Sequence, residues 1–172
     1  MRAVALAAGV TPGAIYRHFS SREQLIEEAV TAAFGLLEQR IWRALAQHPV
    51  GSFERIGALG AMYLEFARQS PGDFRVLFHP AGEGPRRIET AACFSAINIL
   101  EECVRDAMAA GVLVDDDPRL VALMLWSRLH GLITLFMTFD FSGAYPDLAP
   151  DNAIDHVADE TRRFIFDGLR RR

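Results

Sequence analysis

Hydrophobic residues recur at helical spacing along most of the chain. The clearest stripe lies within residues 21–47, where apolar positions follow one another every three or four residues: Ile26, Val30, Ala33, Leu37, Ile41 and Ala44. Glu28, Glu38 and Arg43 fall between these positions. A stripe of this kind, with charged residues off it, predicts a long amphipathic helix that buries one face.

The same pattern predicts helices over most of the remaining chain. We expect them at residues 2–8, 53–69, 73–78, 87–110, 118–139 and 153–169. The segments HPVGS, SPGD, HPAGEGP, GVLVDDDP and FSGAYPDLAPD separate them, and their Pro, Gly and Asp residues stop helices or start new ones. The pattern therefore predicts an all-α fold.

The longest apolar run, residues 120–139, is about as long as a membrane span. Arg128 lies near its centre and would cost about 2.5 to 3.5 kcal/mol on insertion scales, and Ser127, His130 and Thr134 add polar groups. A helix that is apolar all round also suits a protein core or a dimer interface. We favour these alternatives over a membrane span.

Composition and charge restrict the possible partners. A chain of 172 residues that is 51% hydrophobic can form one sizeable core, or a small head on a larger body. The formal net charge of −4 argues against a surface that binds nucleic acid or membrane all over. Through residue 22, however, the chain carries Arg2, Arg17 and Arg22 and no Asp or Glu. Only this amino-terminal part suits a polyanion.

The stretch GVTPGAIYRHFSSREQL contains two helix starts. Gly9 can adopt a left-handed backbone and end the preceding helix. Thr11 can cap the next helix, and Pro12 at its first position loses no needed N–H group. Gly13 keeps this helix start slim, so that its backbone amides can approach a phosphate or a base edge.

Side chains of this short helix divide between two faces. Ile15 and Phe19, four residues apart, are expected to face inward. Tyr16, Arg17 and His18 then project to the other side, where they suit phosphates or bases.

A second helix start follows at once. Ser20 and Glu23 have the spacing of a capping box, which places Arg22 in the first turn beside unpaired backbone amides. A plain helical hairpin with solvated polar residues is the alternative, and the ordered combination of signals disfavours it.

The segment RAVALAAGVTPGAIYRHFSSREQLIEEAV resembles the helix-turn-helix of the TetR family of transcriptional regulators. The turn corresponds to residues 5–10, the recognition helix to 13–19 and the start of the next helix to 21–25. The resemblance implies phosphate contacts by Thr11, Tyr16, His18 and Arg22, positions at or near base edges for Pro12, Gly13 and Arg17, and a contact by Arg2 from the preceding helix.

TetR heads ordinarily have a further helix before the position of Met1. Its absence would leave Val4, Leu6, Ile15 and Phe19 partly uncovered. We expect that the start of the protein has been assigned too late and that Met1 is an internal residue of a longer native chain. A true truncation with impaired DNA binding is the alternative.

The body carries a second resemblance. MYLEFARQSPGDFRVLF and WSRLHGLITL resemble a TetR carboxy-terminal domain subgroup with a Trp-His-Gly signature, here Trp126, His130 and Gly131, with the Trp three residues further ahead than a contiguous motif requires. The resemblance implies a ligand-binding and dimerisation domain.

The residues themselves are compatible with an apolar cavity. Its candidate lining is Met62, Phe66, Phe74, Leu77, Phe78, Phe94, Ile97, Met124, Trp126 and Phe136, with Asn98, His130 and Thr134 as polar partners. Each of these residues also suits an ordinary core.

The hypothesis is a ligand-responsive repressor with a helix-turn-helix head and connecting helix in residues 1–46 and a ligand-binding and dimerisation domain in residues 47–172. We expect double-stranded operator DNA and a small apolar or amphipathic effector as partners, a cytoplasmic location, and no catalysis, cofactor or metal. A ligand-binding or adaptor protein that has lost DNA binding is the alternative.

A homodimer is expected because one helix-turn-helix reads only a few base pairs. The last two helices are the candidates for its interface, since the final helix repeats apolar residues at Ile154, Val157, Thr161, Phe164 and Ile165. Two copies would then form a four-helix bundle.

Overall fold

A computed structural model describes residues 1–78, 91–141, 143 and 153–169, without the side chains of residues 91–94, 153, 161–162 and 164–166. These residues form eight α-helices, and none of them forms a strand, as the hydrophobic pattern predicts. The helices are α1 (Arg2–Ala7), α2 (Pro12–His18), α3 (Arg22–Leu45), α4 (Phe53–Gln69), α5 (Pro71–Phe78), α6 (Ala91–Ala109), α7 (Pro118–Thr138) and α8 (Ala153–Leu169).

The helices predicted at 53–69 and 153–169 have the observed bounds, and the other predicted ends that the structure describes differ from the observed ones by at most two residues. The helix predicted at 21–47 is shorter at both ends, and those predicted at 2–8 and 118–139 each end one residue earlier. Helix α5 begins two residues before the predicted start, because the backbone carbonyl of Ser70 already accepts a hydrogen bond from Phe74 N. The beginning of the helix predicted at 87–110 lies outside the described residues.

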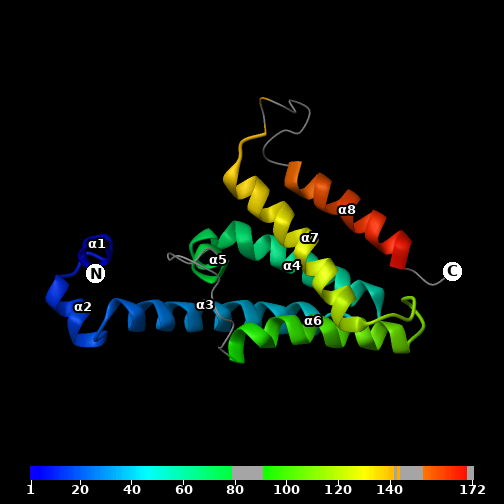
Figure 1. Ribbon diagram of the computed structural model, residues 1–172, viewed down its shortest axis with the longest axis horizontal. Coiled ribbons are helices and arrows are strands. Elements are labelled where there is room, and N and C mark those ends of the chain that lie inside the picture. The colour runs from blue at the N-terminus through cyan, green and yellow to red at the C-terminus, as the bar shows by residue number, and fades with distance from the viewer. Residues whose placement is uncertain (79–90, 142, 144–152, 170–172) are drawn as a thin grey trace.

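Helix α3 connects two parts of the molecule (Figure 1). Helices α1 and α2 lie at its amino-terminal end, apart from the other helices. Its remaining length packs against α4, α5 and α6, while α7 packs on α4 and α6, and α8 runs beside α7. We call α4 to α8, with the part of α3 that they cover, the body. The structure therefore presents α1, α2 and the start of α3 as a separate helix-turn-helix segment, residues 2–22.

The core of the body forms on the predicted stripe of α3. Its buried residues are Val30, Ala33, Phe34, Leu37, Ile41 and Leu45, while Ile26 and Ala44 are half-buried. From the other helices the core receives Ile56, Leu59, Phe66, Phe74, Leu77, Val104, Ala107, Val121 and Ile133, among others. Burial of these side chains, worth about 1.5 to 3 kcal/mol for each large one, fixes α3 to the body.

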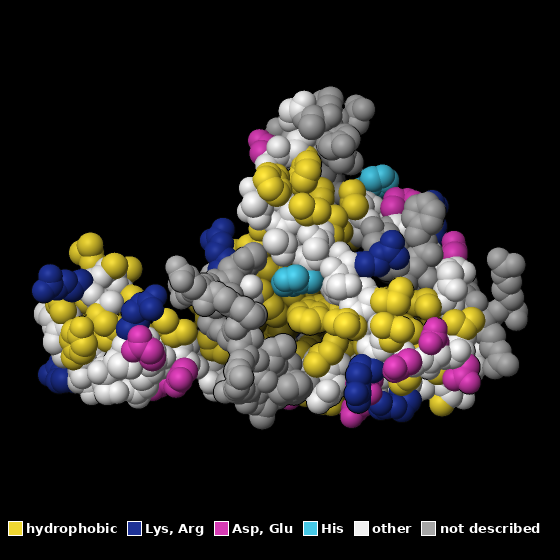
Figure 2. Space-filling view, viewed as in Figure 1, with side chains coloured by type: hydrophobic (Ala, Val, Ile, Leu, Met, Phe, Trp, Pro, Cys, Tyr) yellow, Lys and Arg dark blue, Asp and Glu magenta, His cyan; other side chains and the backbone are white. Residues whose placement is uncertain are grey.

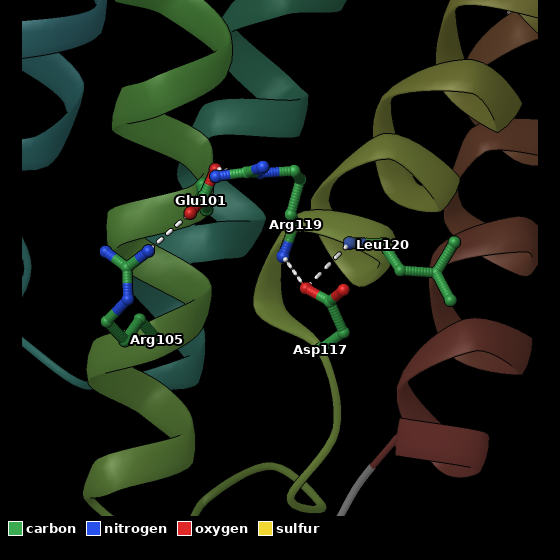
Figure 3. Close-up of polar contacts among 5 residues, drawn as sticks. All are labelled: Glu101, Arg105, Asp117, Arg119 and Leu120. Carbon is green, nitrogen blue, oxygen red and sulfur yellow. Dashed lines mark hydrogen bonds and ion pairs between the residues drawn. The ribbon is translucent and has the colours of Figure 1, made fainter.

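Polar contacts fix the start of α7 against α6 (Figure 3). Asp117 caps α7, because its Oδ1 accepts hydrogen bonds from the backbone N of Arg119 at 2.9 Å and of Leu120 at 3.5 Å. Glu101 on α6 pairs with Arg105 on the same helix and with Nε of Arg119 at 3.4 Å. A carboxylate only 13% exposed thereby joins the two helices.

Helix α7 packs against the other helices of the body with one side only. It is the one described helix that is long and apolar enough to cross a membrane, and 17% of its apolar window is buried. Leu120, Leu123, Met124 and Leu135 are about half exposed. The core of a single chain therefore accounts for only one side of this helix, and the other side is an apolar surface.

Candidate DNA-binding and ligand-binding sites

The turn between α1 and α2 has the predicted geometry. Gly9 has a φ of +66°, and its backbone N donates to the carbonyl of Leu6 at 3.2 Å. The N of Val10 donates to the carbonyl of Ala5 at 2.9 Å. Glycine adopts this left-handed conformation without the steric penalty of a side chain, so Gly9 ends α1 as expected.

Helix α2 begins at the expected cap. Thr11 Oγ1 accepts a hydrogen bond from Ala14 N at 3.3 Å, and Pro12 occupies the first position of the helix. A Cβ atom at Gly13 would meet nothing within 4 Å. Packing within the chain does not require a glycine at this position, whereas close approach of a ligand to the helix start would.

The second helix start lies one residue later than the sequence pattern suggests. Ser21, not Ser20, caps α3, and its Oγ accepts from Gln24 N at 3.1 Å. Gln24 Oε1 in turn accepts from Ser20 N at 2.7 Å. The expected box of Ser20 and Glu23 is therefore wrong, because the backbone is still extended at Ser21. Arg22 becomes the first residue of the helix.

The eight candidate DNA-binding residues are all exposed: Arg2, Thr11, Pro12, Gly13, Tyr16, Arg17, His18 and Arg22. Ile15 on the opposite face of α2 is buried, and Phe19 is half-buried. Figure 2 shows basic side chains over this end of the molecule. Val4 and Leu6 on α1 are 41% and 85% exposed. Helix α2 thus separates an inner apolar face from an outer polar one, as predicted, whereas α1 keeps apolar side chains exposed.

Four of the candidate ligand-binding residues meet in one ring cluster. Phe74 and Phe78 come from α5, and Trp126 and His130 come from α7. The ring centroid of His130 lies 4.9 Å from that of Phe78 and 5.6 Å from those of Phe74 and Trp126. Side chains from two segments far apart in sequence therefore form one wall of the body.

Tyr63 on α4 completes this cluster and was not among the predicted site residues. Its hydroxyl lies 2.9 Å from Nδ1 of His130 and 3.3 Å from Nε1 of Trp126. Burial raises the pKa of Tyr63 above its ordinary value, against a smaller opposing effect of the hydrogen bond from Trp126. Its place in the stripe of α4, between Leu59 and Phe66, is the sequence signal that marks it as a buried polar group. The ring cluster is Tyr63, Phe74, Phe78, Trp126 and His130.

The other candidates are distributed differently. Phe66 and Leu77 are buried in the core, Met62, Ile97 and Phe136 are half-buried, and Asn98 and Met124 are exposed. The side chain of Phe94 lies outside the described residues. Thr134, on the α7 face that carries Trp126 and His130, has a buried hydroxyl without a hydrogen-bond partner.

Arg40 connects α3 to the junction between α4 and α5. Its Nη1 donates to Gln69 Oε1 at 3.0 Å, and its Nη2 donates to Ser70 Oγ at 3.3 Å. The guanidinium also lies over the ring of Phe66, 5.4 Å from the centroid. Since α5 begins directly after Ser70, this contact links α3 to the helix that carries Phe74 and Phe78 of the ring cluster.

Possible metal-ligand groups can be judged only in the part of the chain that the structure describes. Within it, no three His, Cys, Asp or Glu side chains are grouped so that they could hold a metal ion.

A helix-turn-helix on a long helix that enters a helical body defines a regulator of transcription. Residues 1–29 match the tetR family of bacterial regulatory proteins, and residues 56–161 match the tetracyclin repressor-like C-terminal domain. The chain therefore belongs to the TetR family. Membership of the Trp-His-Gly subgroup stays a prediction.

Relatives agree with this assignment. The chain is 29% identical over 143 residues to the nucleoid occlusion factor SlmA of Shewanella loihica, across 80% of this chain and 72% of that protein. A protein of unknown function from Rhodococcus sp. RHA1 is similar in structure, with a TM-score of 0.75, 25% identity and coverage of 99% of this chain and 84% of that one. A TetR regulator from Chloroflexus aurantiacus shares the fold, with a TM-score of 0.67, 19% identity and coverage of 98% and 82%.

Proposed function

We propose that this TetR-family regulator is a ligand-responsive repressor that binds operator DNA as a homodimer. The main support for this proposal is that all eight candidate DNA-binding residues are exposed around two adjacent helix starts, while Ile15 faces inward. Thr11, Tyr16, His18 and Arg22 would contact backbone phosphates. Pro12, Gly13 and Arg17 would lie at base edges, and Arg2 would add a contact from α1. Backbone amides and arginine side chains together suit the phosphate backbone.

The dimer interface that we propose is the uncovered side of α7 together with α8. Leu120, Leu123 and Met124 near the start of α7 and Leu135 near its end are about half exposed. An exposed apolar face of this length is typical of an interface between subunits. On α8, Ile154 and Val157 are half-buried, while the side chains of Thr161, Phe164 and Ile165 lie outside the described residues. Two copies would place two recognition helices on one DNA duplex.

The effector site that we propose is the ring cluster in the body, with a small apolar or amphipathic molecule as its ligand. The connection from the cluster to the DNA passes through α5, whose Phe74 and Phe78 belong to the cluster. Arg40 and the core contacts of Phe74 then join α5 to α3, which carries the helix-turn-helix segment. A displacement of α5 by a ligand would change the orientation of α3.

We place the boundary between the two domains at residues 46 and 47, just after the end of α3. Helix α3 begins in the helix-turn-helix segment and packs against the body along its remaining length. Such a regulator works in the cytoplasm, and we propose no reaction for it.

The test begins with DNA. Duplexes retained from a random pool by the purified chain would be cloned, and their affinity measured by fluorescence anisotropy at several salt concentrations. We expect an inverted repeat as the selected sequence, two chains per duplex, and an affinity that falls steeply with salt. If no sequence is enriched and no duplex is retained at low salt, the repressor proposal fails, and the adaptor alternative takes its place.

A further inference from the structure

The hydroxyl of Thr134 is the unpaired polar group beside the ring cluster. Its Oγ1 is buried and has no hydrogen-bond partner. Trp126, His130 and Thr134 follow one another at intervals of four residues on α7 and so share one face of the helix. Buried hydroxyls in proteins are nearly always hydrogen-bonded, and an exception calls for a partner that the chain does not supply.

The polar groups of the ring cluster are by contrast engaged with one another. An indole N–H can only donate, so Trp126 donates to the hydroxyl oxygen of Tyr63. The same hydroxyl lies within hydrogen-bond distance of Nδ1 of His130, 2.9 Å away. The hydroxyl of Tyr63 therefore has two partners within the cluster.

The rings around these groups offer apolar contact. Phe78, Trp126 and His130 are half-buried, so parts of their rings stay open. Figure 2 shows hydrophobic side chains gathered in a recess of this face, with a histidine side chain at its edge. Aromatic rings in such a setting pack against other flat rings edge to face or with an offset.

We propose that the effector is a neutral aromatic molecule with one hydroxyl or carbonyl group, whose ring packs against Phe78 and Trp126 and whose oxygen pairs with the hydroxyl of Thr134 after the side chains that cover this hydroxyl have shifted. This inference rests on the proposed function only in placing the effector at the ring cluster. A carboxylate or an ammonium group would lose its hydration beside these apolar rings, so a neutral ligand is favoured.

The experiment uses the full chain without DNA and three probes of one shape. Isothermal titration calorimetry would compare β-naphthol, naphthalene and β-naphthoate, which carry a hydroxyl, no polar group and a carboxylate. We expect β-naphthol to bind more tightly than either of the others. The variant Thr134→Val keeps the shape of the side chain and removes the hydroxyl. It should weaken β-naphthol binding by about 3- to 10-fold and leave naphthalene binding unchanged.

Two control variants make the result specific. Thr134→Ser keeps the hydroxyl and should retain β-naphthol binding. Thr138→Val, one turn further along α7, removes an exposed hydroxyl that donates to the carbonyl of Thr134 and should change nothing. The inference is overturned if no probe binds, if β-naphthoate binds as tightly as β-naphthol, or if Thr134→Val and the wild type bind β-naphthol equally.

The proposed function can fail separately. DNA retention by the wild type without binding of any probe overturns this inference alone. Thr134-dependent binding of β-naphthol by a chain that retains no duplex supports the ligand class and overturns the repressor.

Discussion

The hydroxyl of Tyr63 lies 2.9 Å from Nδ1 of His130 and thereby joins α4 to α7 inside the body. Phe74 on α5 lies against both rings, with centroid distances of 5.7 Å to Tyr63 and 5.6 Å to His130. Three helices therefore meet at this hydrogen bond. Since α5 also packs on α3, the pair Tyr63 and His130 connects the proposed effector site to the helix that carries the helix-turn-helix segment.

Removal of the Tyr63 hydroxyl is expected to destabilise the body. Tyr63→Phe would leave Nδ1 of His130 and the indole N–H of Trp126 without this partner. We expect the free energy of unfolding to fall by about 1 to 3 kcal/mol in urea denaturation followed by circular dichroism. Tyr16→Phe is the matched control, because Tyr16 is 56% exposed, and should change stability by less than about 0.5 kcal/mol. Equal effects of the two substitutions would contradict the structural role of Tyr63.

The same hydroxyl predicts a loss of stability in alkali. Burial raises the pKa of Tyr63 above the ordinary 10.0. A raised pKa in the folded state means that the contribution of Tyr63 is complete below pH 10 and is lost as the pH rises toward the folded-state pKa. Between pH 10 and the folded-state pKa, the free energy of unfolding should fall with an added slope of about 1.4 kcal/mol per pH unit. Denaturation curves of Tyr63→Phe should lack this added slope, and a wild type with the same slope as the variant would refute the prediction.

Sequence patterns predicted the helices well, because a helix of the length of α3 shows its buried face in local spacing. They failed by one residue at the capping of α3, where Ser20 and Ser21 are equally good caps and only the backbone decides between them. Tyr63 was missed because its partners come from α7, and local spacing carries no information on such pairing. The uncovered side of α7 was equally hidden, since a helix that is apolar all round does not reveal which side the chain itself covers.

The DNA-binding segment can be tested through salt dependence. If Arg22 contacts a phosphate, Arg22→Ala should weaken binding to all selected duplexes alike and reduce the slope of log affinity against log salt concentration by about 0.9. Arg75→Ala removes an equal charge from an exposed position on α5. That control should leave the slope unchanged, and a similar reduction in both variants would mean that Arg22 acts through net charge alone.

The dimer interface can be tested with a charge on α7. Leu123 is 50% exposed and lies between Leu120 and Met124 in the first half of α7. Leu123→Arg would bury a guanidinium between subunits, so we expect analytical ultracentrifugation to show a dimer for the wild type and a monomer for the variant. Val50→Arg places the same charge at a 69% exposed position outside α7 and α8. If the Leu123→Arg variant is still a dimer, the interface lies on another surface of the protein.

The contact between Arg40 and the start of α5 is expected to hold α3 in its orientation. Arg40→Met keeps a long apolar side chain over Phe66 and removes the hydrogen bonds to Gln69 and Ser70. Hydrogen bonds from a charged donor contribute about 1.5 to 3 kcal/mol, so the first turn of α5 should open more often. The amide of Phe74, which donates to the Ser70 carbonyl, should then exchange about 10-fold faster in hydrogen–deuterium exchange, since 1.4 kcal/mol corresponds to a factor of ten.

The control for this variant is Arg43→Met, because Arg43 lies three residues further along α3 and is exposed. It should leave the exchange of the Phe74 amide unchanged. Operator affinity gives a second measurement: if Arg40 sets the direction of α3, Arg40→Met should weaken binding without reducing the slope against salt, because no phosphate contact is lost. Unchanged exchange in Arg40→Met would show that apolar packing of Phe74 and Leu77 alone fixes α5 to α3, and the path from the ring cluster to the DNA would then run through the core.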